Sequence, residues 1–253
     1  STPKPSSAAS DVYKRQQLID CTATVSELFL KRVLEHGDKV ALREKDFGLW
    51  NEYSWSDWGD FAKWVGLGLV SLGFSRGDVC SIASEVNKEW MFADLGVITM
   101  GGVTNGVYPT DASNQVEYLI TDSGTRFYFD EDEEQLDKVL EVRERTPTLE
   151  KIIIFDMEGL RNFDDPQCLS FTNLIELGQQ YELDHPRLWS EEVGKAGPDD
   201  LMILTYTSGT TGPPKGAMIS QQNMMYMMKN LQSVYAVSYT HLRAHETSLH
   251  LVC

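Results

Sequence analysis

The chain has 253 residues, of which 42% are hydrophobic and 24% charged, and its formal net charge at pH 7 is −16. A chain of this length and composition can bury a core, in one large or two small domains. Binding to a nucleic-acid backbone or to anionic lipid needs a positive surface. The charge therefore excludes nucleic acid as a partner and excludes broad attraction to lipid headgroups. We expect any bound anion to be held by a local group of donors.

The cysteines and the apolar runs bear on where the protein acts. Cys21, Cys80, Cys168 and Cys253 lie far apart and form no C-x-x-C pair. This spacing is typical neither of a disulfide framework nor of a zinc site, and it fits a reducing cytosol. No apolar run approaches the roughly 18 residues of a membrane span, so the sequence predicts no transmembrane segment. We expect a cytoplasmic protein, and peripheral contact with a membrane stays open.

The two ends differ in composition from the middle of the chain. Residues 1–16 are rich in Ser, Ala and Pro, and residues 238–253 hold three of the five histidines. Both ends resemble translated adapter sequence, so we predict that the native segment is 17–237. His241 and His245 are four residues apart and would share a helix face, but no further ligand pattern completes a metal site there. We expect no bound metal at these residues.

From residue 24 onward, helix and strand patterns alternate. Apolar residues at three- and four-residue spacings predict helices, and short apolar runs bounded by Gly, Pro, Asn or Asp predict strands. The predicted helices are 25–35, 55–72, 87–100, 113–123, 131–145 and 171–181. The predicted strands are 40–43, 51–54, 78–84, 103–107, 125–130, 151–156 and 201–204.

This order of elements predicts the fold class. Strands separated by helix-length crossovers form parallel βαβ units, so we expect an α/β fold with helices on both faces of a mostly parallel sheet. The acidic stretch 130–134 begins a predicted helix, where negative charge complements the helix dipole. We interpret it as helix capping and solvation, not as a cation site. Phosphate ligands in such folds bind at the carboxyl ends of strands, where Thr207 falls.

The segment 201–216 carries the strongest functional signal. A four-residue apolar run has the length of a buried strand, and it is followed by Thr, Ser, Gly and Pro residues and then by Lys215. Glycines let the backbone approach a ligand, hydroxyl and N–H groups donate hydrogen bonds, and a lysine supplies a cation. The segment therefore predicts a polyphosphate site.

Two other interpretations of this segment fit less well. A flexible Gly/Ser/Thr linker rarely follows an apolar strand directly and rarely ends in Pro-Pro-Lys-Gly. The nucleotide loop of P-loop NTPases needs Ser or Thr after its lysine, where this chain has Gly216, and its glycine spacing also differs.

The residues 206–216, YTSGTTGPPKG, closely resemble the phosphate-binding signature of the adenylate-forming superfamily. The stretches 43–46, 101–110 and 130–140 are similar to the N-terminal part of AMP-forming long-chain acyl-CoA synthetases within that superfamily. The resemblance covers residues 23–235, so it implies that 17–237 is an incomplete N-terminal AMP-binding domain of the adenylate-forming fold.

The resemblance implies a ligase whose substrates are ATP with Mg²⁺, a long-chain fatty acid and coenzyme A. The fatty-acid carboxylate attacks the α-phosphate of ATP, giving an acyl-adenylate and pyrophosphate, and the coenzyme A thiol then displaces AMP. Charge on the leaving pyrophosphate needs donors and a cation. The implied donors are Thr207, Ser208, Thr210 and Thr211, the positions of close approach are Gly209 and Gly212, and the catalytic cation is Lys215.

Much of the family's active site is expected beyond residue 237, including its adenine-binding strand, its metal-binding glutamate and its C-terminal lysine. We therefore expect the 253-residue chain alone to be inactive as a ligase. Two alternatives stay open: another adenylate-forming ligase, acting on an aryl or medium-chain acid, and a fragment that binds ATP without catalysis.

Overall fold

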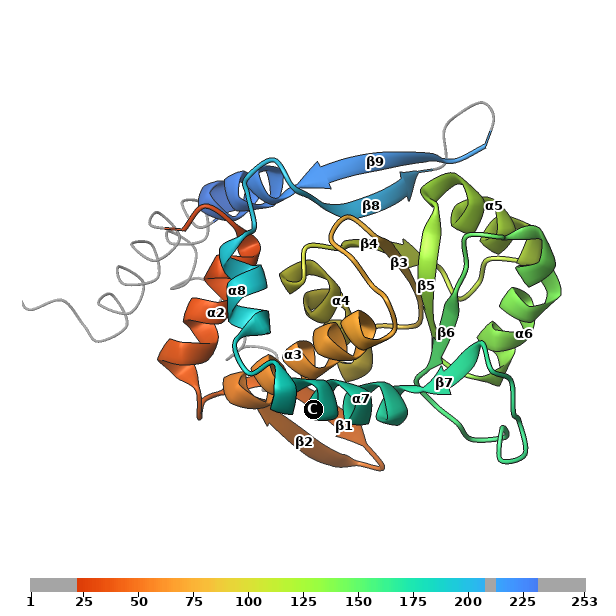
Figure 1. The fold of residues 1–253 in the computed structure, drawn as a ribbon, viewed down its shortest axis with the longest axis horizontal. Coiled ribbons are helices and arrows are strands. Elements are labelled where there is room, and N and C mark those ends of the chain that lie inside the picture. Colours follow the sequence, from red (N-terminus) through yellow and green to blue (C-terminus); the bar gives the residue numbers. More distant parts are fainter. Residues whose placement is uncertain (1–21, 208–212, 232–253) are drawn as a thin grey trace, which may run out of the picture.

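The computed structural model describes residues 22–207 and 213–231. A seven-stranded sheet with the order β7-β6-β5-β3-β4-β8-β9 runs through the centre, and a two-stranded sheet, β1-β2, lies apart from it (Figure 1). The predicted adapter-like ends, 1–16 and 238–253, lie outside the described residues, so the limits of the native segment stay a prediction.

All neighbouring strands of the large sheet are parallel except β8 and β9, which are antiparallel. Its strands are β3 (Val79–Ala83), β4 (Val103–Val107), β5 (Thr125–Asp130), β6 (Lys151–Ile154), β7 (Cys168–Ser170), β8 (Leu201–Thr207) and β9 (Lys215–Ser220). The smaller sheet is an antiparallel hairpin formed by β1 (Val40–Asp46) and β2 (Leu49–Ser54), which contain the predicted strands 40–43 and 51–54.

Helices cover both faces of the large sheet (Figure 1). One face packs against α5 (Ser113–Ser123) and α6 (Glu133–Val142), and the other against α3 (Trp55–Ser71), α4 (Lys88–Thr99) and α7 (Phe171–Asp184). The remaining helical segments are α2 (Val25–His36), η1 (Arg143–Arg145), α8 (Leu188–Gly194) and residues 221–231. The predicted α/β fold with a mostly parallel sheet is confirmed.

The sequence of β5 shows why the sheet is buried on both faces. Phe127 and Phe129 pack into the core shared with α3, α4 and α7, whereas Tyr128 between them packs into the core shared with α5 and α6. All three side chains are at most 1% exposed. Because successive residues of a strand point to opposite faces, a continuous apolar run is what a covered central strand requires.

The acidic stretch 130–134 divides into two environments. Asp132 is the N-cap of α6 and accepts a hydrogen bond of 3.1 Å from the backbone N–H of Gln135, as the capping interpretation predicted. Asp130, at the end of β5, is instead 0% exposed. The interpretation of the whole stretch as solvated is therefore wrong for Asp130, because this residue belongs to the strand and points into the core.

Four elements were not predicted: β7, α8, β9 and the helix of residues 221–231. β7 has three residues and α8 has seven, too few for a periodic pattern to register. β9 exists because it pairs with β8, and this pairing also extends the predicted strand 201–204 as far as Thr207. Local sequence carries little of this information, since the partner strand supplies the hydrogen bonds.

The buried carboxyl of Asp130 leads to a prediction about pH. Neither oxygen has a hydrogen-bond partner among the described residues. Burial, and then the charge of Asp132, raises the pKa of Asp130 well above its ordinary value. The folded state therefore holds this proton more tightly than the unfolded state. The resulting stability is complete below the unfolded pKa of about 4 and falls as pH rises toward the folded pKa.

Between the two pKa values, Asp130 should make the free energy of unfolding of the wild type fall by up to about 1.4 kcal/mol per pH unit. We expect Asp130→Asn to abolish this fall. Urea unfolding of both proteins between pH 5 and pH 8 measures the difference, and Asp137→Asn, which alters an exposed carboxyl of α6, is the control. Parallel pH profiles for the wild type and the Asp130 variant would contradict the assignment.

Candidate phosphate-binding hairpin at the carboxyl edge of the sheet

The β8–β9 hairpin carries the two predicted site residues that the structure describes. In its register Thr207 pairs with Lys215, Tyr206 with Gly216 and Thr205 with Ala217. The other predicted contacts, Ser208, Gly209, Thr210, Thr211 and Gly212, lie outside the described residues. The structure thus brings Thr207 and Lys215 together on adjacent strands.

The hairpin lies where the prediction placed it. β8 is parallel to β4, β3 and β5, so Thr207 lies at the edge of the sheet where all these strands end. The side chains of Thr207 and Lys215 are both exposed. Within the described part of the chain, no carboxylate forms an ion pair with Lys215. A hydroxyl and a cation therefore lie side by side and accessible to an anionic ligand.

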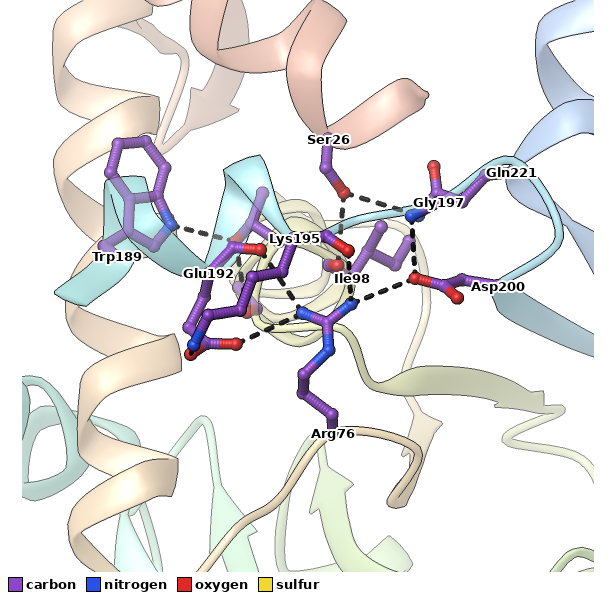
Figure 2. Close-up of polar contacts among 11 residues, drawn as sticks. Ser26, Arg76, Ile98, Trp189, Glu192, Lys195, Gly197, Asp200 and Gln221 are labelled. Atoms are coloured by element: carbon purple, nitrogen blue, oxygen red, sulfur yellow. Dashed lines mark hydrogen bonds and ion pairs between the residues drawn. The ribbon is translucent and has the colours of Figure 1, made fainter. Parts of the chain in front are cut away.

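The open end of the hairpin is fixed by an ion network around Arg76 (Figure 2). Its guanidinium donates to Glu192 Oε2 at 3.2 Å and to Asp200 Oδ2 at 2.9 Å. Asp200 Oδ2 also accepts from the backbone N–H of Gly197 at 2.9 Å. Because Asp200 directly precedes β8, this network holds the entry to the hairpin against α8.

The residue that follows β9 closes the same end of the hairpin. The backbone N–H of Gln221 donates to Asp200 O at 2.9 Å, so the entry and exit of the hairpin are joined. Its side chain reaches α2, where Val25 N–H donates to Gln221 Oε1 at 2.9 Å and Gln221 Nε2 lies 3.3 Å from Ser26 Oγ. Ser26 in turn donates to Ile98 O of α4 (Figure 2). The open end is tied to three helices.

Replacing Arg76 tests how much this network stabilises the fold. We expect Arg76→Met to lower the free energy of unfolding by about 1–2 kcal/mol, because the Glu192 carboxylate, only 11% exposed, then keeps Lys195 as its one cationic partner among the described residues and Asp200 loses its ion pair. The value is below that for fully buried pairs since Arg76 is one-third exposed.

The matched control is Arg43→Met, which removes a surface ion pair whose two side chains are 60% and 49% exposed. Chemical denaturation should show a change below about 0.5 kcal/mol for this variant. Equal effects of the two substitutions would mean that the Arg76 network contributes no more than a surface pair.

The loop end of the hairpin contacts α5. The Tyr206 hydroxyl donates to Asp122 Oδ2 at 2.7 Å, and the Tyr118 hydroxyl donates to Pro214 O at 2.8 Å. The two tyrosine rings meet edge to face with centroids 6.3 Å apart. A Cβ at Gly216 would lie 3.2 Å from Tyr206 Cζ, so glycine here lets the Tyr206 ring approach β9.

These contacts were not predicted from the sequence. Tyr206 belongs to the signature but had no role assigned, and Tyr118 and Asp122 were part of a predicted helix without a function. Their spacing of four residues, which places them on one helix face, was the available signal.

Other features bear on metals and membranes. In the described ranges, no group of three or more His, Cys, Asp or Glu side chains is arranged to hold a metal ion. Of the helices in those ranges, none combines the length and the apolar character needed to span a bilayer.

A mostly parallel sheet covered on both faces by helices defines a doubly wound α/β domain. Ligands of such domains bind outside the carboxyl ends of the strands, where Thr207 and Lys215 of the Ser/Thr/Gly-rich segment lie. By sequence, the chain belongs to the family of AMP-binding enzymes, which it matches over residues 29–252.

Curated relatives include long-chain-fatty-acid–CoA ligases. The ligase ACSBG2 of Xenopus laevis is 29% identical over 203 residues, covering 80% of this chain and 27% of that protein. ACSBG1 of Rattus norvegicus is also 29% identical, covering 80% of this chain and 28% of that protein. FadD15 of Mycobacterium bovis is 27% identical over 211 residues, covering 83% of this chain and 33% of that protein. The chain thus spans about a quarter to a third of the length of these relatives.

Solved structures share the fold. The anthranilate CoA ligase AuaEII, in complex with anthranoyl-AMP, superposes with a TM-score of 0.66 at 22% identity, covering 81% of this chain and 36% of that chain. The A-PCP didomain of the carboxylic acid reductase from Segniliparus rugosus, in complex with AMP, superposes with a TM-score of 0.61 at 14% identity. This match covers 83% of this chain and 33% of that chain. At these identities the likeness concerns the fold alone.

Proposed function

We propose that this chain supplies the ATP-phosphate-binding hairpin of a ligase that activates a long-chain fatty acid through an acyl-adenylate to acyl-CoA. The observation that carries the proposal is the exposed pair Thr207 and Lys215, which are paired across β8 and β9, one residue inside each end of the signature segment 206–216. Membership of the AMP-binding family and the names of the curated relatives support it.

The proposed roles follow from residue chemistry. Thr207, Ser208, Thr210 and Thr211 donate hydroxyl or backbone hydrogen bonds to the β- and γ-phosphates, and Gly209 and Gly212 allow the backbone to approach them. Lys215 places its ammonium group beside the pyrophosphate, where negative charge grows as the carboxylate oxygen bonds to the α-phosphorus and the bridging oxygen leaves. The hairpin thus stabilises a leaving group and needs no nucleophile of its own.

Mg²⁺ enters the reaction with ATP as part of the substrate. At the hairpin, the hydroxyl of Thr207 and the ammonium group of Lys215 are suited to phosphate oxygens, so the hairpin's proposed role concerns the phosphates of the Mg·ATP complex. Magnesium at nucleotide sites is held largely by phosphate oxygens and water, with one or two carboxylates. Coenzyme A is the second-step substrate, and the groups that bind it are proposed to lie in a longer protein that contains this chain.

The substrate proposal is tested by ATP–pyrophosphate exchange in that longer protein, expressed from the same gene. Palmitate, octanoate and anthranilate are compared as carboxylate substrates, each with saturating Mg·ATP. We expect exchange with palmitate to exceed that with the other two acids at least about tenfold, since a long apolar tail adds binding energy that a short acid lacks.

The other outcomes separate the alternatives. Preferred exchange with octanoate or anthranilate would replace the long-chain assignment with a medium-chain or aryl one. Absence of exchange with every acid would contradict the ligase proposal, and nucleotide binding alone would then favour a non-catalytic ATP-binding protein. The 253-residue chain by itself should show no exchange.

A further inference from the structure

The part of the hairpin that carries Thr207 and Lys215 extends beyond the sheet. The pairing of β8 with β4 joins Thr104 to Ile203 and Asn105 to Leu204 and reaches no further along β8. From Thr205 to the loop, β8 is therefore paired with β9 alone. A two-stranded ribbon is at best marginally stable in water, so this end of the hairpin needs support from another element.

Helix α5 supplies that support on both strands. On β8, the hydroxyl of Tyr206 donates a hydrogen bond to Asp122 of α5, and Tyr206 directly precedes Thr207. On the other side of the loop, the carbonyl of Pro214 accepts a hydrogen bond from Tyr118 of α5, and Pro214 directly precedes Lys215. Each hydrogen bond thus ends one residue from a proposed phosphate contact, on opposite sides of the loop.

The position of Asp122 in α5 indicates that its carboxylate serves the hydrogen bond with Tyr206 and not the helix. It lies in the last turn of α5, next to the final residue Ser123. A negative charge there is unfavourable to the helix dipole, so the helix itself gains nothing from it. Burial, and then the hydrogen bond to Asp122, raises the pKa of Tyr206, so its hydroxyl keeps its proton and remains a donor near neutral pH.

We propose that Tyr118 and Asp122 are positioning residues that clamp both flanks of the phosphate-binding loop to α5 and thereby set Thr207 and Lys215 against the phosphates of ATP. The clamp acts through Tyr206 and Pro214, and neither α5 residue touches the substrate. This inference rests on the proposed function and adds to it the element that orients the hairpin.

The test compares Tyr118→Phe, Asp122→Ala and their combination in the longer protein, by pyrophosphate exchange with the acid that supports it. We expect kcat/KM for Mg·ATP to fall about threefold for each single variant and about tenfold for the double variant, as the loss of one or two neutral or partly exposed hydrogen bonds implies. The KM for the carboxylic acid should stay unchanged, because the clamp does not act on that substrate.

Two further variants separate positioning from general damage. Asp122→Asn keeps an acceptor oxygen for Tyr206, so it should retain kcat/KM for Mg·ATP within about twofold. Tyr226→Phe removes an exposed tyrosine hydroxyl from helix 221–231, which lies at the opposite end of the hairpin. This variant should have the kcat/KM for Mg·ATP and the KM for the acid of the wild type. Hydrogen exchange of the 253-residue chain adds a readout without substrate: amides of residues 205–207 and 215–217 should exchange faster in the double variant.

Different outcomes would overturn the clamp formed by Tyr118 and Asp122 and the proposed ligase function. An active wild type whose ATP kinetics and hairpin exchange rates are the same in the double variant would overturn the clamp alone. Equal losses for Mg·ATP and for the acid would also overturn it, since they indicate general damage. A wild type without exchange toward any acid would overturn the proposed function and the clamp with it.

Discussion

Lys215→Ala is expected to lower kcat/KM for Mg·ATP by about 100-fold in pyrophosphate exchange. Removing one preorganised donor that stabilises developing charge has effects of this order in other enzymes. The side chain is exposed, and no carboxylate pairs with it in the described part of the chain. Its loss should therefore leave the free energy of unfolding unchanged within about 0.5 kcal/mol.

The matched control is Lys229→Ala, which removes an exposed lysine from helix 221–231. It changes the net charge by the same amount and should leave both kcat/KM and stability as in the wild type. Equal kinetic effects of the two substitutions would show that Lys215 acts only through the overall charge of the protein, and the assigned role would then be wrong.

Gly178→Ala is expected to lower the free energy of unfolding by about 3 kcal/mol, within the upper range for overpacked cores. A Cβ at this position of α7 would lie 1.9 Å from Trp64 O and 2.6 Å from Trp64 C in α3. These are backbone atoms, so a side-chain rotation cannot relieve the overlap. The two helices would have to separate. Gly68 of α3, where a Cβ would lie 2.4 Å from Leu174 O, shows that the close approach is made from both sides.

Urea denaturation of the 253-residue chain measures this effect. Gly194→Ala is the control, because an added Cβ at this glycine of α8 would meet no atom within 4 Å beyond its chain neighbours and its own helix backbone. Alanine there should be neutral or stabilising by about 0.5–1 kcal/mol, since it restricts the unfolded chain. A Gly178 variant as stable as the Gly194 variant would mean that α3 and α7 do not pack as closely as described.

The parts of the fold that the sequence predicted well are those whose patterns are local. The helix 113–123 and the strands 103–107 and 125–130 have the observed bounds, because Gly, Pro and capping residues mark their ends and their apolar spacing is regular. The helix predicted over 131–145 is divided into α6 and η1, since its last turn tightens at Arg143.

What the sequence did not predict depends on partners distant along the chain. β9 is a strand because β8 lies beside it, and its Met218 is 70% exposed, so no burial pattern marks it. The burial of Asp130 follows from its place at the end of a central strand, whereas its acidic neighbours suggested solvent.

The candidate site was predicted from one segment and its surroundings were not. Thr207 and Lys215 were named from residue type and from the signature, and the structure pairs them across two strands. Tyr118 and Asp122 lie 96 and 84 residues from their partners in the sequence, a separation that no local pattern bridges.

The β8–β9 hairpin is proposed to hold the phosphates of ATP through Lys215. The most direct measurement is reductive methylation of lysines followed by mass spectrometry, with and without saturating Mg·ATP, in the longer protein. We expect Mg·ATP to protect Lys215 while the exposed Lys229 is labelled to the same extent in both samples. Labelling of Lys215 that is unaffected by saturating Mg·ATP would contradict this role of Lys215.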